Sequence, residues 1–236
     1  MQATLRNKGN MPLRWALLAG VLINFVLTCV SLALHPALLG SKTLDTVIMS
    51  FLLLFLYALI GFFLTRSTNP LLAKALQQGT LIALICAGTE VINISIETLV
   101  DLTQEASTIA TLSFMLLLFL LFGVAGFVGT RSTGTLRFGL LASVWCAMGS
   151  ILLTVLFGFS VNFLFTQRLS SLLASDMVHS QSGLTDVHIF AVYNTLDSAS
   201  SHLLEGPILA LIFGTLGGLL WKGLQRWRTA HIQRGA

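Results

Sequence analysis

Six long apolar segments constrain this chain more than any other feature of its sequence. A helix needs about 20 mostly apolar residues to cross the roughly 30 Å hydrocarbon core of a membrane. The apolar residues are continuous rather than alternating, which disfavours β-strands. We therefore predict an all-α integral membrane protein, a bundle of six transmembrane helices that forms one polytopic domain over residues 1–236. The predicted helices cover residues 13–34, 46–64, 71–98, 108–129, 136–165 and 203–224.

The composition excludes several other classes of protein. Charged residues make up 9% of the chain and hydrophobic residues 55%, whereas a soluble domain carries roughly 25% charged residues. A soluble enzyme, a disordered protein and a nucleic-acid-binding protein are excluded as first interpretations, because there is too little charge to cover a water-facing surface. We expect the lipid bilayer as a partner, no nucleic acid and no cofactor, since no nucleotide, dinucleotide or haem motif is present.

Prolines mark the expected beginnings of two helices. Asn69-Pro70 precedes the third apolar segment, and Gly206-Pro207 lies near the beginning of the sixth. Proline is favoured in a first helical turn, where its missing N–H would be unbonded anyway. We therefore expect the third and sixth helices to begin at these prolines.

The positions of the basic residues predict an orientation. Lys and Arg near the ends of membrane helices mark the cytoplasmic side. With six helices, only Lys42 and Arg168 fall on one side, and the other eleven of the 13 Lys and Arg residues fall on the opposite side. We expect a protein of the cell membrane with both termini in the cytoplasm and residues 166–202 as a long outer loop.

Two similar segments indicate an internal repeat. Residues 61–68 (GFFLTRST) and 126–133 (GFVGTRST) are identical at six of eight positions and lie 65 residues apart. We interpret them as traces of a duplication that gives three tandem helical hairpins, the third of which has diverged. A simpler explanation of the shared TRST stretch is a helix end whose arginine lies at the lipid headgroups.

The third apolar segment carries a row of polar side chains. Their spacing predicts that they share one helical face. We expect Gly79, Ala83 and Ala87 on the opposite face, where small residues let another helix approach closely. The polar row comprises Cys86, Glu90, Asn93, Glu97, Asp101 and Gln104.

Glu90 is the central candidate for a functional residue. If the hydrocarbon begins near Gly79, a rise of 1.5 Å per residue places Glu90 about 16 Å deep, near the midplane. A charged carboxylate at that depth costs about 2.5–3.5 kcal/mol on insertion scales, so we expect Glu90 to point into the bundle. We expect Asn24 as its hydrogen-bond partner. The candidate pathway comprises Glu90, Asn93, Asn24, Glu97, Thr28, Ser150 and Thr154.

The long outer loop, residues 166–202, has two apolar stripes of helical spacing. One comprises Leu169, Leu172, Leu173 and Met177, and the other extends from Ile189 to Leu203. They predict two helices that rest on the outer surface of the bundle. We expect these helices to bury Leu172, Leu173, Tyr193 and Leu196.

Histidines and carboxylates near this loop are candidate metal ligands. His202 and Glu205 are three residues apart, a spacing at which two helical side chains could share a metal ion. A third ligand would have to come from His188 or Asp186. A polar surface in contact with water is the alternative interpretation of the same residues.

Three functional hypotheses follow. The favoured one is a transporter of a small solute or ion, or the membrane subunit of a transport complex, with a polar site around Glu90. The second is a non-catalytic assembly or scaffold subunit, in which the polar side chains act as hydrogen-bond clamps between helices. The third, and least favoured, is a membrane enzyme with an outer site of His, Asp and Glu. Homo-oligomerisation or a transport-complex partner fits the first two.

Overall fold

The computed structural model describes residues 11–40, 43–173, 184 and 186–234. Over these ranges the chain is helical and contains no strand, and six helices are long and apolar enough to cross a membrane. The prediction of an all-α bundle of six membrane helices is therefore confirmed. The six are α2 (Met11–Leu34), α3 (Leu44–Arg66), α4 (Pro70–Leu99), α5 (Gln104–Thr133), α6 (Leu136–Leu164) and α9 (Val187–Arg234).

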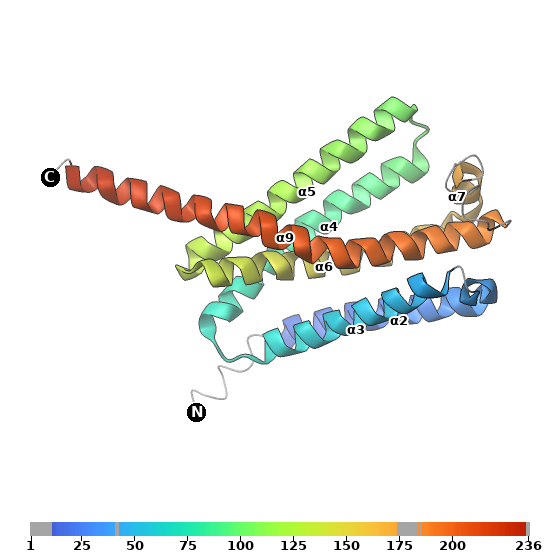
Figure 1. Cartoon of the computed structure of the whole chain (residues 1–236), viewed down its shortest axis with the longest axis horizontal. Coiled ribbons are helices and arrows are strands. Elements are labelled where there is room, and N and C mark those ends of the chain that lie inside the picture. The colour runs from blue at the N-terminus through green and yellow to red at the C-terminus, as the bar shows by residue number, and fades with distance from the viewer. Residues whose placement is uncertain (1–10, 41–42, 174–183, 185, 235–236) are drawn as a thin grey trace.

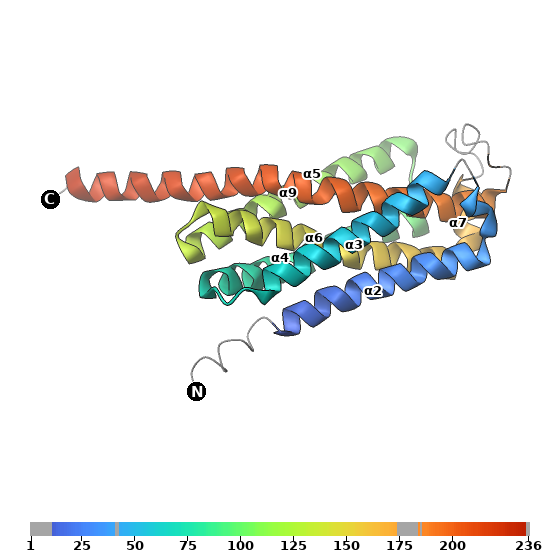
Figure 2. The same cartoon turned by 60° about the horizontal axis from the view of Figure 1, so that its bottom comes forward.

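Two short helices lie at one end of the bundle (Figure 1). The 3₁₀-helix η1 (Pro36–Leu39) connects α2 to α3, and α7 (Thr166–Leu173) follows α6. We call this end the loop side. The opposite end, where α2 begins and α9 ends, is called the terminal side. Figure 2 shows that α9 extends beyond the other helices on the terminal side.

Helix α6 is the central helix of the bundle. It contacts α2, α4, α5 and α9. In its most apolar stretch 61% of the residues are buried, against 22% to 39% in the other five membrane helices. Many of its buried side chains are small, including Gly139, Ala142, Ser143 and Ala147. Small residues let neighbouring helices approach closely, which is how helices pack in lipid.

Glycines bring α5, α6 and α9 together on the terminal side. A Cβ atom on Gly126 of α5 would overlap the backbone of Gly214 of α9, and one on Gly217 of α9 would overlap the backbone of Gly123. A Cβ atom on Gly139 of α6 would overlap the carbonyl oxygen of Gly126. These five residues are named the glycine junction. A Cβ atom on Gly126 or Gly217 would overlap backbone atoms, so a side chain at either position forces the helices apart, whereas a Cβ atom on Gly123 would lie at an ordinary 3.5 Å from the Phe213 carbonyl oxygen.

The hydroxyl of Ser143 reinforces the glycine junction. Ser143 Oγ lies 2.9 Å from the carbonyl oxygen of Phe122 on α5 and 2.8 Å from that of Ala210 on α9. Ser143 is fully buried on α6. One small polar side chain therefore joins the same three helices whose backbones the glycines bring close.

The α2–α3 hairpin is attached to the rest of the bundle by buried hydrogen bonds. Asn24 Nδ2 donates to the carbonyl oxygen of Leu152 on α6 at 2.9 Å. The hydroxyls of Ser50 on α3 and Ser200 on α9 lie 2.7 Å apart. Figure 1 shows this hairpin on one side of the α6–α9 pair, and toward the loop side it shows the α4–α5 hairpin on the other.

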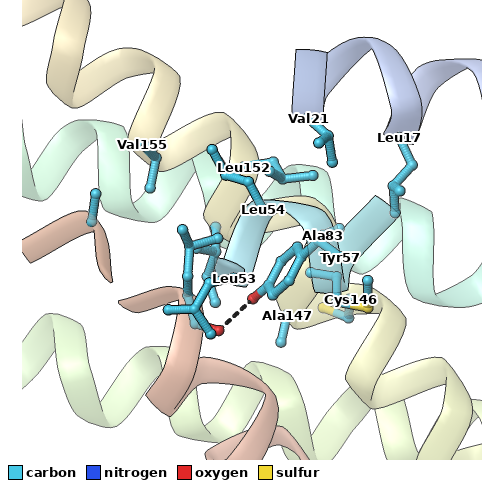
Figure 3. Close-up of a cluster of buried hydrophobic side chains, with 14 of the residues drawn as sticks. Leu17, Val21, Leu53, Leu54, Tyr57, Ala83, Cys146, Ala147, Leu152 and Val155 are labelled. Atoms are coloured by element: carbon cyan, nitrogen blue, oxygen red, sulfur yellow. Dashed lines mark hydrogen bonds between the residues drawn. The ribbon is translucent and has the colours of Figure 1, made fainter. Parts of the chain in front are cut away.

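Helix α9 passes through Pro207 without interruption, so the expectation that the sixth helix begins there is wrong. Proline has no N–H to donate to the carbonyl oxygen of Leu203, four residues earlier. Tyr57 of α3 supplies the missing donor, because its hydroxyl donates to that oxygen at 2.9 Å (Figure 3). The freed carbonyl is thus not left unpaired, which would be costly inside a membrane. Pro70, by contrast, is the first residue of α4 as expected.

The outer-loop predictions are confirmed only in part. The second apolar stripe is the first part of α9 rather than a separate surface helix, whereas α7 matches the beginning of the first stripe. Leu196 is buried, Leu173 and Tyr193 are half-buried, and Leu172 is exposed, contrary to expectation. Met177 lies outside the described residues. Leu172 is exposed because α7 buries chiefly Ser170.

The two TRST segments differ in backbone conformation. Helix α3 ends at Arg66, and Ser67 is extended. Helix α5 continues through the second segment to Thr133, and Gly134 then turns the chain with a φ of 75°. Both segments lie at the terminal side, and the proposed duplication stays a prediction from the sequence.

The bond between Tyr57 and Leu203 predicts a coupling between two substitutions. Tyr57→Phe should lower the free energy of unfolding by about 1–3 kcal/mol, because a buried carbonyl loses its donor. In a Pro207→Ala background the restored N–H bonds that carbonyl, so the same change should cost clearly less. Reversible denaturation in mixed micelles would measure both differences. An equal cost in the two backgrounds would contradict the role assigned to Tyr57.

The glycine junction predicts a position-specific effect of alanine. Gly217→Ala should destabilise the bundle by about 1–3 kcal/mol, because the new methyl group meets backbone atoms that have no room to move. Gly88→Ala on α4 is the matched control, since a Cβ atom there meets nothing within 4 Å. Thermal unfolding in lipid nanodiscs would compare the two variants. Equal midpoints would argue against the junction.

Candidate functional site

A cavity lies between the α4–α5 hairpin and the α6–α9 pair. Figure 1 shows these two pairs of helices diverging toward the loop side. A space of about 360 Å³ between them is lined by residues of α4, α5, α6, α7 and α9. A smaller space of about 130 Å³ adjoins it and extends toward Phe122 and Leu209. We call the two spaces together the polar cavity. They have five residues in common: Glu90, Asn93, Thr111, Met115 and His202.

Glu90 lies on the wall shared by the two parts of the polar cavity. Its side chain is half-buried. Among the described residues it has no hydrogen-bond or ion-pair partner. The carboxylate therefore faces a space between helices and is available to a bound molecule.

Asn93 and Thr154 present unpaired polar atoms to the same space. Asn93 of α4 and Thr154 of α6 both line the larger part of the cavity. Asn93 Oδ1 and Thr154 Oγ1 are buried and have no hydrogen-bond partner among the described residues. Thr154 is only 6% exposed. A buried polar group without a partner costs about 1–3 kcal/mol, so these two atoms call for a partner inside the cavity.

Three other predicted pathway residues have structural roles. Asn24 Nδ2 donates to the carbonyl oxygens of Gly20 and Leu152. Thr28 Oγ1 donates to the carbonyl oxygen of Asn24, and Ser150 Oγ to that of Ala147. The expectation that Asn24 bonds Glu90 is therefore wrong. Similar depth in the membrane does not place two side chains on facing sides of their helices, and Asn24 lies where α2 meets α6.

The small and the polar residues of α4 share one face, so the expectation of opposite faces is wrong. At 100° per residue, Gly79, Ala83, Cys86 and Glu90 fall within one arc of about 60°. A Cβ atom on Gly79 would overlap the Ala142 carbonyl of α6, and Cys86 Sγ lies 3.6 Å from Cys146 Sγ. This face packs on α6 toward the terminal side and lines the polar cavity toward the loop side.

The polar row also ends earlier than predicted. Helix α4 ends at Leu99, so Asp101 lies in the turn that follows it and Gln104 begins α5. Only Glu90, Asn93 and Glu97 of the row line the polar cavity. Glu97 Oε1 lies 2.8 Å from Thr111 Oγ1 of α5.

His202 and Glu205 reach the polar cavity from α9. His202 lines both parts, and Glu205 lines the smaller part. His202 Nδ1 lies 2.6 Å from the carbonyl oxygen of Ser198. A carbonyl oxygen can only accept, so Nδ1 carries the proton and a neutral His202 has Nε2 as a free acceptor.

The predicted metal ligands are not brought together. Asp186 Oδ1 accepts from the backbone N–H of His188 at 2.8 Å, at the beginning of α9. His188 Nδ1 lies 2.8 Å from Ser170 Oγ of α7. Fourteen residues of one helix separate His188 from His202, which corresponds to about 21 Å. In the part of the chain that the structure describes, no group of three His, Cys, Asp or Glu residues could hold a metal ion.

Helix α7 lies at the loop-side end of the polar cavity, which Leu169 lines. Arg168 forms an ion pair with Asp101 and donates to the carbonyl oxygen of Thr98 at the end of α4. Ser170 contacts His188 of α9. A single short helix thus connects the two helix pairs between which the cavity lies.

Sequence reasoning missed the contribution of α5. Met115, Leu118, Phe119 and Phe122 line the cavity beside Thr111, but these four belong to a run of leucines and phenylalanines. No sequence signal distinguishes them from residues that face lipid. The one sequence signal for the contact between α7 and the end of α4 was Arg168, which is one of only two basic residues predicted on the loop side.

Comparisons with protein-family models, with curated proteins and with solved structures give no match. The six apolar helices indicate a multi-pass membrane protein.

Proposed function

We propose that this membrane protein binds a small polar solute or ion in the polar cavity and serves its transport, alone or as the membrane subunit of a transport complex. One observation carries the proposal: Asn93 Oδ1 and Thr154 Oγ1 are buried and unpaired, and they line one cavity together with Glu90. Buried polar atoms in native proteins are nearly always bonded. A polar ligand, or the water it replaces, supplies the missing partners.

The arrangement of the helices suits access from one side at a time. The polar cavity extends toward the loop side, where the two helix pairs diverge. On the terminal side the glycine junction holds α5, α6 and α9 in backbone contact. Many transporters bind substrate near the midplane and expose the site alternately to each side. We propose that the structure corresponds to the state open to the loop side.

Removal of the unpaired hydroxyl of Thr154 should change the stability of the protein and its affinity for solute in opposite directions. Thr154→Val keeps the shape of the side chain, and without ligand it should raise the free energy of unfolding by about 1 kcal/mol, because an unsatisfied buried group disappears. The same variant should bind solute about tenfold more weakly. Thermal shifts in nanodiscs with a panel of amines, amino acids, sugars and inorganic cations would measure both quantities. Thr89→Val, which loses a hydroxyl bonded to Ile85 O outside the cavity, is the matched control.

Two results would contradict the proposal. If no solute in the panel stabilises the wild-type protein, the cavity is a packing defect and a scaffold role is favoured. If a solute stabilises the wild type and Thr154→Val equally well, binding occurs somewhere other than the polar cavity.

We also propose that the terminal side is cytoplasmic. Arg66 and Arg131 lie in the last turns of α3 and α5 on this side, and basic residues at helix ends favour the cytoplasm. A reporter protein that is active only in the cytoplasm should therefore be active when it is fused after Arg66 or Arg131. A reporter that is active only outside the cytoplasm should be active when it is fused at Glu105. A cytoplasmic signal at Glu105 would contradict this orientation.

A further inference from the structure

We propose that the ligand of the polar cavity is an organic ammonium ion, a protonated amine that carries an apolar group. This inference rests on the proposed function and adds the chemical class of the substrate. The charges, the hydrogen-bonding groups and the apolar surface of the cavity support it separately.

The ionisable groups of the cavity favour a cation. Glu90, Glu97 and Glu205 contribute carboxylates, and among the described residues no Lys or Arg lines either part of the cavity. Glu97 is bonded to Thr111, whereas Glu90 and Glu205 have no partner within the described ranges. An anion would meet three carboxylates against one basic side chain, His202, among the described lining residues, so anionic solutes are disfavoured.

The hydrogen-bonding groups favour a ligand with N–H donors. Glu90 and Glu205 can only accept when ionised, and in a neutral His202 Nε2 is an acceptor because Nδ1 donates to the carbonyl oxygen of Ser198. Asn93 Oδ1, buried and unpaired, is a further acceptor on the same wall. An ammonium group offers up to three donors to such a set. A hard inorganic cation instead prefers a complete shell of oxygen ligands.

The remaining surface of the smaller part is apolar. Met115, Leu118, Phe119 and Phe122 of α5 face Ile151 of α6 and Leu209 of α9 across it. Phe119 is stacked on Phe213, with ring centroids 4.5 Å apart. Carboxylates beside aromatic rings and a methionine suit a cation with an apolar body, since aromatic faces also attract positive charge. A small hydrated ion would leave this surface unused.

The test compares 2-phenylethylamine, protonated at neutral pH, with two controls: neutral 2-phenylethanol and sodium ion. Binding is measured by titration calorimetry on the full chain in nanodiscs of zwitterionic lipid, with empty nanodiscs as the blank. We expect saturable binding of the amine, at least about tenfold tighter than that of the alcohol. Glu90→Gln should weaken amine binding by about tenfold or more, because a charge-assisted hydrogen bond is lost.

Two further variants keep the test decisive. Glu105→Gln, at an exposed position of α5 outside the cavity, should bind the amine as the wild type does. Glu205→Gln should also weaken binding, and it replaces Glu90→Gln if that variant does not fold.

The outcomes distinguish the ligand class from the proposed function. Binding of the alcohol or of sodium that depends on Glu90, without amine binding, would overturn the ammonium class and support the cavity as a solute site. Amine binding unaffected by both Glu90→Gln and Glu205→Gln would overturn the proposal. If none of the three probes binds, the ammonium proposal is overturned, whereas the proposed function fails only if the wider solute panel is also negative.

Discussion

The bundle depends on the close approach of three helix backbones at the glycine junction. Helices in lipid gain little from apolar burial, so their association relies on van der Waals contact and on hydrogen bonds that require short distances. Gly126, Gly139 and Gly214 provide that contact on the terminal side. Toward the loop side the larger side chains of Met115 and Phe119 on α5 line the polar cavity together with residues of α9. The polar cavity thus adjoins the region in which α5 and α9 change from small to large residues.

The polar side chains within the bundle fall into two groups with different partners. Asn24, Tyr57, Ser143 and Asn162 each bond a backbone carbonyl of a neighbouring helix. Such bonds join helices and leave no donor for a ligand. Asn93 and Thr154 have an unpaired buried atom and face one cavity. Asn24 Oδ1, Ser31 Oγ and Thr130 Oγ1 are also buried and unpaired, but they do not line the polar cavity. An unpaired atom together with a place in the cavity wall therefore marks a candidate ligand contact.

The sequence predicted the membrane helices better than their partners. Apolar runs reveal helices because length and hydropathy are properties of one segment. Glu90, Asn93, Glu97 and Thr154 do line one cavity, but Asn24 does not contact Glu90, because depth gives no information about which way a helix faces. The prediction that the sixth helix begins at Pro207 was wrong, because the donor that replaces the missing N–H comes from Tyr57, about 150 residues away in the chain. His202 and Glu205 reach the cavity although His188, their expected partner in a metal site, does not.

The most direct test of the central claim, that one face of α4 borders a polar cavity, is a thiol-accessibility measurement. Single cysteines at Asn93 and Glu97 would be compared with cysteines at Ile85 and Ile92, which are exposed on the outer surface of the bundle. The native exposed Cys29 is first replaced by alanine. A charged thiol reagent added to the protein in membranes should modify Asn93→Cys and Glu97→Cys and leave Ile85→Cys and Ile92→Cys unmodified. Equal reaction at all four positions, or protection of Asn93→Cys and Glu97→Cys, would contradict the cavity.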